Sequence, residues 1–253
     1  MKKIFFAVIL ACLLAGCTTY YNPVTKKTEY TVYSEQDEID MGAAADEKLQ
    51  KENKIIETPA RIRQIGEKIG TVSDRPGLKY TIRIMENEEV NAFALPGGYI
   101  YLYTGLLDRS DSYDEIANVV GHEIAHVCAR DGVNQMQKTL LYSIPAQILL
   151  QNRSEAIKQA VDAAFTITML KYSREDEIRA DTLGVTYAHR AGYNPEGMIA
   201  FFQKLQELEN KSSSLQINFL RSHPDINARI ENVRAVIKTL KPSSGSTWQY
   251  NPS

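Results

Sequence analysis

The stretch NVVGHEIAHVCARD, residues 118–131, constrains the fold of this 253-residue chain more than any other segment. Its apolar residues have the spacing of a buried helix, yet it also contains His122, Glu123 and His126. Burying an imidazole or a carboxylate among aliphatic side chains costs several kcal/mol unless the group is paired or bound to a metal. The fold must therefore bring compensating partners to this helix from elsewhere in the chain.

His122, Glu123 and His126 form the pattern H-E-x-x-H. Residues four apart lie on one face of a helix, so the two imidazoles can bind one zinc ion while the glutamate reaches a water molecule beside it. The pattern alone is equally consistent with a surface or structural pair of histidines. The apolar flanks decide the matter here, because unpaired imidazoles in a buried helix would be costly. We therefore predict one zinc ion per chain at this helix.

A second segment, EDEIRAD at residues 175–181, offers a further ligand. Catalytic zinc takes three protein ligands, and Glu177 and Asp181 again share one helix face. We expect Glu177 to be the third ligand and Asp181 to accept a hydrogen bond from a ligating imidazole. Ala180 and Gly184 are small enough to let the two helices approach closely. Taken alone, this charged run would be interpreted as a solvated helix face.

The remaining pattern predicts an α+β fold that is mainly helical, with a small sheet beside the H-E-x-x-H helix. Alternation in KYTIRIME and the two apolar runs of NAFALPGGYIYLYTGLL, joined by Pro-Gly-Gly, predict strands and a hairpin or tight turn. Ser112 with Glu115 is typical of a helix start. Helices are expected at 34–52, 59–70, 154–189 and 195–209, in a segment that starts at Ser112 and contains residues 118–131, and in a last segment ending at 240. Residues 140–150 are expected to form a helix or flap packed on the domain.

The N-terminus has the features of a secretory signal. Two lysines precede a short apolar run that ends in LLAGC, which looks like a bacterial lipobox and implies cleavage before Cys17 and acylation of that cysteine. Thr18 follows, so the aspartate that retains lipoproteins at the inner membrane is missing, and an outer-membrane anchor facing the periplasm is favoured. We expect a cleaved signal at 1–16, a lipid-anchored tether at 17–33, a catalytic domain at 34–241 and a flexible tail at 242–253.

Composition narrows the partners. The formal net charge of −2 gives no indication of a basic surface that would bind nucleic acid. Cys12 leaves with the signal and Cys17 is acylated, so Cys128 has no partner for an intramolecular disulfide and is expected to be a small buried hydrophobe. His189 is expected to be structural. The oligomeric state does not follow from the sequence.

H-E-x-x-H followed by E-x-x-A-D resembles the gluzincin zinc metallopeptidases of the HtpX and CAAX-prenyl-protease family. The resemblance extends to NAFALPGG at 91–98, KYSREDEIRADTLG at 171–184 and HPDINARI at 223–230. It covers roughly residues 34–240. The chain lacks the membrane helices of the founding members and the helical-repeat extension of some periplasmic ones, so it is most similar to a short, outer-membrane lipoprotein branch.

The resemblance implies roles for particular residues. His122, His126 and Glu177 would hold zinc, and Glu123 would act as general base and acid. The strand at Asn91 and Ala92 is similar to the edge strand on which gluzincins bind an extended substrate through its backbone.

The C-terminal motif leaves alternatives open. His223 could stabilise the oxyanion, could occupy the open zinc position and hold the enzyme latent, or could simply start the last helix. Arg229 could pair with an active-site carboxylate or contact the substrate.

The leading hypothesis is therefore a zinc endopeptidase in the bacterial envelope, anchored to a lipid bilayer through Cys17, that cleaves unfolded or misfolded proteins. The alternative is a zinc-stabilised, lipid-anchored chaperone-like or assembly module with latent proteolysis. A third hypothesis, a structural lipoprotein without metal, predicts no stoichiometric zinc.

Overall fold

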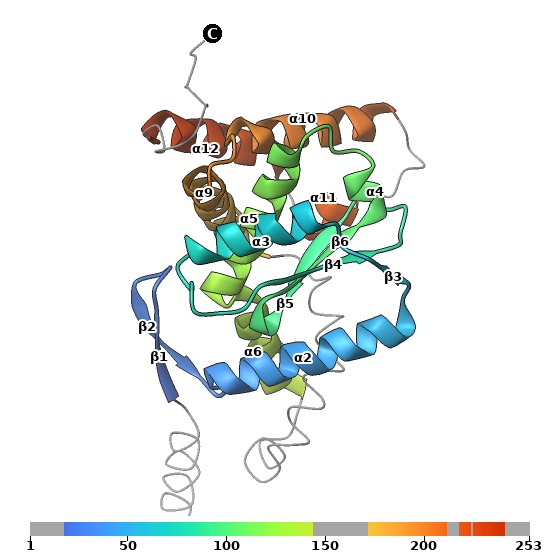
Figure 1. The fold of residues 1–253 in the computed structure, drawn as a ribbon. Helices are drawn as coiled ribbons and strands as arrows, with labels where there is room; N and C mark the ends of the chain where they lie inside the picture. Colours follow the sequence, from blue (N-terminus) through green and yellow to red (C-terminus); the bar gives the residue numbers. More distant parts are fainter. Residues whose placement is uncertain (1–17, 144–171, 212–217, 224, 241–253) are drawn as a thin grey trace, which may run out of the picture.

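The computed structural model describes residues 18–143, 172–211, 218–223 and 225–240 (Figure 1). These residues form an N-terminal hairpin, a four-stranded mixed sheet and helices that cover both faces of the sheet. The fold is α+β and mainly helical, as predicted. The helices are α2 (Glu35–Glu52), α3 (Ala60–Thr71), α4 (Thr104–Leu107), α5 (Tyr113–Ala129), α6 (Asp131–Ser143), α9 (Arg174–Arg190), α10 (Glu196–Lys211), α11 (Asn218–Ser222) and α12 (Ile226–Thr239).

The strands of the sheet follow the order β3-β4-β6-β5. The β4 and β6 strands are parallel, whereas β3 is antiparallel to β4 and β5 is antiparallel to β6. The hairpin predicted around Pro-Gly-Gly is confirmed: one 3-10 turn, η1, joins β5 to β6, and Gly97 and Gly98 take the left-handed φ values of 73° and 93° that favour glycine. The strands are β3 (Ile55–Ile56), β4 (Thr81–Met85), β5 (Ala92–Leu95) and β6 (Tyr99–Tyr103), and η1 spans Pro96–Gly98.

Alternating side chains divide the sheet between two hydrophobic clusters. Ile82, Ile84 and Ile100 point to the face covered by α3 and α5, whereas Phe93 and Tyr101 point to the face covered by α2. Figure 1 shows α2 on one side of the sheet and α3 with α5 on the other. The sheet is therefore the middle layer, and α5 lies against it with its length buried.

The helices α5 and α9 pack backbone to backbone. A Cβ atom added to Gly121 would lie 2.5 Å from the carbonyl oxygen of Gly184, and one added to Gly184 would lie 2.5 Å from the backbone nitrogen of His122. The small residue at 184 therefore permits the close approach that the sequence predicts. This approach places the EDEIRAD segment directly over H-E-x-x-H.

The N-terminal residues differ from the predicted tether. Residues 18–31 form an antiparallel hairpin of β1 (Thr18–Asn22) and β2 (Lys27–Thr31). It is docked on the domain, because the fully buried Asn22 side chain donates a hydrogen bond to the carbonyl of Ala129 at the end of α5. Tertiary contacts of this kind leave no local signal in a polar sequence.

A second difference concerns the helix predicted at 154–189. Its described part, α9, begins at Arg174, where Ser173 and Asp176 form a reciprocal capping box. The rest of that prediction, most of the 140–150 segment, the signal at 1–16 and the tail at 242–253 lie outside the described residues. Within the described ranges, no helix has both the length and the apolar character that crossing a membrane would require.

Candidate metal centre

The helix α5 brings H-E-x-x-H into the centre of the molecule. Ser112 caps it by accepting a hydrogen bond from the backbone N–H of Glu115, as predicted from the sequence. Every residue from Glu115 to Ala129 is buried. The helix ends at Arg130, whose left-handed φ of 58° turns the chain sharply into α6. The two histidines of the motif are 0% and 2% exposed.

Four potential ligands converge at this point from three segments. The Nε2 atoms of His122 and His126 are 3.1 Å apart, and Glu177 on α9 places its carboxylate oxygens 3.6 Å and 3.4 Å from them. The Nδ1 atom of His223, which follows α11, lies 3.3 Å from the Nε2 of His122 and 2.9 Å from Glu177 Oε1. All four side chains are buried, and the ligand atoms lie within 4.8 Å of one another.

These spacings fit a tetrahedral zinc ion. Zinc bound to nitrogen and oxygen at about 2.0–2.2 Å separates neighbouring ligands by about 3.3–3.6 Å in a tetrahedron. The distances of 3.1–3.6 Å among the donor atoms of His122, His126 and Glu177 are close to that edge length, whereas the 2.9 Å between His223 Nδ1 and Glu177 Oε1 is a hydrogen-bond distance. Imidazole nitrogen and carboxylate oxygen are also donors that zinc accepts. The residues present therefore fit one zinc ion.

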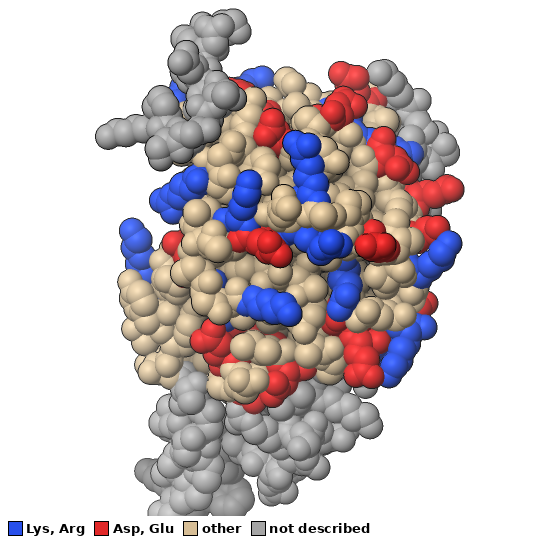
Figure 2. All heavy atoms as spheres, viewed as in Figure 1, with Lys and Arg blue, Asp and Glu red and all other residues tan. Residues whose placement is uncertain are grey.

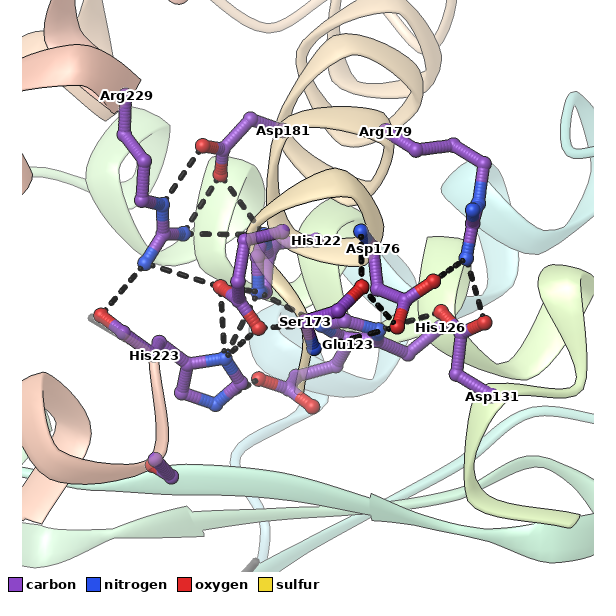
Figure 3. Close-up of polar contacts among 12 residues, drawn as sticks. His122, Glu123, His126, Asp131, Ser173, Asp176, Arg179, Asp181, His223 and Arg229 are labelled. Atoms are coloured by element: carbon purple, nitrogen blue, oxygen red, sulfur yellow. Dashed lines mark hydrogen bonds and ion pairs between the residues drawn. The ribbon is translucent and has the colours of Figure 1, made fainter. Parts of the chain in front are cut away.

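Each histidine of the motif is oriented by an aspartate behind it (Figure 3). The Nδ1 atom of His122 lies 2.9 Å from Asp181 Oδ1, as predicted for this residue. The Nδ1 atom of His126 lies 2.8 Å from Asp131 Oδ2, and Arg179 from α9 donates to the other oxygen of Asp131. Such partners fix the ring and the tautomer of a ligating histidine.

The two imidazoles differ in their electrostatic surroundings. Burial lowers the pKa of His122 to about 3, against the opposing effect of Asp181. For His126, burial also opposes protonation, but the hydrogen bonds with Asp131 and Glu177 outweigh it and raise the pKa to about 10. The partners of the two rings therefore favour the neutral imidazole at His122 and the protonated imidazole at His126.

Glu123 lies beside the ligand cluster and is only 1% exposed. Its Oε1 atom accepts no hydrogen bond from the described residues, and the Nε2 of His223 is 3.7 Å away. Burial raises the pKa of this carboxyl group. A buried carboxylate oxygen that accepts no hydrogen bond is costly as a purely structural element, and it is suited to accepting a proton from a reactant.

Arg229 on α12 ties several of these groups together. Its guanidinium donates to both oxygens of Asp181, at 2.7 and 2.6 Å, and to the carbonyl oxygen of His223 at 3.0 Å. It also lies 3.1 Å from Glu177 Oε2, and it is 1% exposed. Arg229 therefore pairs with active-site carboxylates, and its burial leaves it no surface with which to contact a substrate.

The segment that presents His223 is held at the start of strand β5. The backbone N–H of Phe219 in α11 donates to the carbonyl of Val90, and the Phe219 ring stacks on the His223 imidazole. This position brings the His223 side chain next to the predicted zinc ligands. The last helix, α12, begins three residues later, at Ile226.

Strand β5 ends the sheet and contains one of the two residues predicted to bind substrate. Ala92 is its first residue, and the carbonyl of Asn91, just before it, accepts a hydrogen bond from Tyr103. On its outer side β5 pairs with no other strand of the described residues. A small cavity of about 10 Å³ lies between β5 and the end of α5, lined in part by Ala94, Leu95 and His126.

Sequence reasoning missed two residues of the site. Asp131 lies beyond the helix and returns to His126 only because Arg130 is left-handed. Tyr172 stacks on His126 with ring centroids 4.1 Å apart. An acid five residues after the motif, followed by glycine, is a weak signal for Asp131, and we find none for Tyr172. His189 and Cys128 are buried away from the ligand cluster.

Comparison with known proteins gives one family and several relatives. The model of peptidase family M48 matches residues 57–237. The mitochondrial metalloendopeptidase OMA1 of Arabidopsis thaliana is 32% identical over 148 residues, which cover 58% of this chain and 30% of that protein. The beta-barrel assembly-enhancing protease of Escherichia coli is 31% identical over 172 residues, which cover 63% and 34%. The chain thus spans about a third of the length of these relatives.

Proposed function

Because the chain belongs to peptidase family M48 and is a zinc metallopeptidase, we propose that it is an endopeptidase that cleaves unfolded or misfolded proteins of the bacterial cell envelope. The observation that supports this most directly is the convergence of His122, His126 and Glu177 with Glu123 beside them. A protein that only needed zinc for stability would have no use for a second buried glutamate beside the three ligands.

The residues divide the work as follows. His122, His126 and Glu177 would hold zinc, which when bound supplies Lewis-acid polarisation of a peptide carbonyl. Glu123 takes a proton from the attacking water and returns it to the amine that leaves. Asp181 and Asp131 keep the two imidazoles in the tautomer that presents Nε2.

The edge of β5 would orient the substrate. An extended chain can add to an open sheet edge through its backbone, and folded proteins offer few such segments. Asn91 and Ala92 lie at the start of this strand, and their backbone groups would pair with the substrate. This arrangement favours unfolded substrates over folded ones.

The envelope location rests on the N-terminal sequence and on relatives. LLAGC places a lipidation cysteine at Cys17, and the residue after it favours the outer membrane. One relative is named a beta-barrel assembly-enhancing protease. We propose that acylated Cys17 anchors the domain to the membrane on the periplasmic side.

A second candidate function has an observation in its favour. His223 supplies a fourth donor atom at ligand distance, whereas catalytic zinc keeps one position open. The described arrangement would therefore be a latent form, which agrees with a zinc-stabilised chaperone-like or assembly module in which proteolysis is suppressed.

Replacing the proposed base tests the leading function. Glu123→Gln should retain stoichiometric zinc but reduce casein cleavage by about 10²–10⁴-fold, because the proton acceptor is lost while the ligands remain. Glu175→Gln, an exposed acid on α9, is the matched control and should cleave like the wild type. Cleavage by Glu123→Gln at the wild-type rate would refute the mechanism, and absence of zinc in the wild type would refute the site.

His223→Ala separates the two roles of that residue. If the imidazole blocks the fourth position, basal cleavage should rise, and if it stabilises the oxyanion, cleavage should fall. Zinc content should be measured in the same preparation, because loss of metal would also lower the rate. An unchanged rate would assign His223 a structural role only.

A further inference from the structure

The outward face of the N-terminal hairpin is unusual because it exposes two aromatic side chains to solvent. Register pairs Thr19 with Tyr30 and Tyr21 with Thr28, and these four side chains point away from the domain. Tyr21 is 60% exposed and Tyr30 is 71% exposed. Among the described residues, the only other large hydrophobic side chain with comparable exposure is Tyr113, at 40%.

The charges of the hairpin are distributed unequally. Lys26 and Lys27 are exposed at its turn. Its single acid, Glu29, is directed inward, where its two oxygens accept hydrogen bonds from Asn22 and Thr25. The outer face is therefore aromatic and hydroxylated, with basic groups at one end and no carboxylate. Figure 2 shows this side of the molecule, at the left where the hairpin lies, as mostly uncharged surface.

The hairpin is fixed to the metal-binding helix. In addition to the contact between Asn22 and Ala129, the guanidinium of Arg130, the residue after α5, lies over the Tyr20 ring at 4.5 Å. Just after β2, the backbone N–H of Val32 donates to the side chain of Gln137 on α6 at 3.0 Å. The orientation of the outer face is consequently set relative to the end of α5, three residues beyond His126.

The position of the anchor identifies the occupant of this face. Cys17 immediately precedes Thr18, the first residue of β1, so a lipid on its sulfur would enter the bilayer at the edge of the hairpin. Tyrosine rings favour the boundary between headgroups and water, and lysines favour anionic lipid surfaces. We infer that the Thr19, Tyr21, Thr28 and Tyr30 face of the hairpin lies against the membrane surface and sets the orientation of the catalytic domain on it.

This inference rests on the proposed lipid anchor at Cys17. The contact of the hairpin face with the membrane is a feature beyond the anchor, since an anchor alone would let the domain take any orientation. A cleft of about 330 Å³ borders the hairpin, and its lining combines Tyr21, Pro23 and Leu78 with the charged Glu35 and Arg75.

Fluorescence quenching tests the contact in the full-length protein, purified in detergent and reconstituted into vesicles of phosphatidylethanolamine and phosphatidylglycerol. Three single-tryptophan variants are needed, each in a Trp248→Phe background: Tyr21→Trp, Tyr30→Trp and Tyr113→Trp. Residue 113 starts α5, at the opposite end from the hairpin contact, and is the matched control. Lipids with a nitroxide near the headgroup should quench residues 21 and 30 at least about twofold more strongly than residue 113.

Two outcomes would overturn the inference. Equal quenching at all three positions would show that the domain has no preferred orientation. Weak lipid quenching at 21 and 30, with or without protection from aqueous acrylamide, would show that the face contacts a protein or water. The mass of the purified protein reports acylation of Cys17 separately, and casein cleavage reports the peptidase, so failure of either proposal is distinguished from failure of this one.

Discussion

At the residue scale, the pairing of His126 with Asp131 gives a prediction about metal affinity. Asp131→Ala removes the acceptor that orients the imidazole, so zinc affinity should fall by about 10- to 100-fold. Competition with a chromogenic chelator measures this without relying on activity. Asp111→Ala is the control, because Asp111 is 82% exposed and pairs with Lys204 away from the site. Equal zinc affinity in both variants would show that Asp131 does not position the ligand.

Arg229 gives a prediction about stability. Arg229→Met leaves Asp181 and Glu177 buried without their cation, so the free energy of unfolding should fall by about 3–5 kcal/mol. Arg234→Met, an exposed arginine on the same helix, should cost little. Urea unfolding at neutral pH compares the two, and a small loss in the Arg229 variant would mean that water or metal compensates the carboxylates.

The residues of the site were predictable to the extent that they share a helix face. Spacing of four identifies His122 with His126 and Glu177 with Asp181, because a helix repeats over that interval. Asp131 was missed because it reaches His126 through a left-handed turn, a property of Arg130 that the sequence does not display. The partners of Arg229 depend on the packing of α12 against α9, which no local pattern specifies.

At the element scale, the contact between α5 and α9 predicts an effect of side-chain volume. Gly184→Ala would place a Cβ atom against the backbone of His122, so the helices must separate. We expect a loss of about 1–3 kcal/mol in stability and weaker zinc binding, since Glu177 moves with α9. Gly77→Ala is the control, because nothing lies within 4 Å of its added Cβ. Wild-type behaviour at 184 would mean that α9 can shift without cost.

The capping box of α9 predicts a pH dependence. Burial opposes ionisation of Asp176, but bonds from Ser173 and Arg179 outweigh it and lower its pKa below the usual 3.8. A depressed pKa in the folded state contributes stability above about pH 4 that is lost as the pH falls through the folded value. Asp176→Asn should therefore cost about 1 kcal/mol at pH 7 and progressively less toward pH 3. The free energy of unfolding of the variant and of the wild type, measured at pH 7 and at pH 3, checks this. For Glu175→Gln, the difference in unfolding free energy from the wild type should not change between pH 7 and pH 3. A loss of stability in Asp176→Asn that stays the same at both pH values would contradict the prediction.

Elements with their own periodicity were the predictable part of the fold. Strand β4 alternates, and α5 has a recognisable N-cap at Ser112 followed by a largely apolar run, so both were expected. The hairpin of β1 and β2 was not, because its polar sequence is stabilised by Asn22 and by the contact of Tyr20 with Arg130. The start of α9 at Arg174 shows that a capping box can end a helical pattern that periodicity alone would extend upstream.

At the scale of the whole molecule, the metal centre joins α5, α9 and the segment after α11, so zinc should stabilise the whole fold. Removing it with a chelator should lower the melting temperature by about 5–10 °C, since a ligand at about 100 times its Kd contributes about 2.7 kcal/mol. Calorimetry before chelation, after it and after zinc is restored checks the effect and its reversibility. A melting temperature that is unchanged when zinc is lost would show that the fold forms without the metal.

Together with the proposed anchor, the hairpin would also limit where in space the peptidase works. A long flexible linker would let the domain reach far from the membrane and meet substrates that diffuse freely in three dimensions. Here, with Cys17 acylated as proposed, one peptide bond separates the anchor from a strand that is docked on the domain. The enzyme would then move laterally with its lipid, and its search for substrates would be close to two-dimensional. The enzyme would often meet unfolded chains at the membrane surface, and it would rarely meet chains far from the membrane.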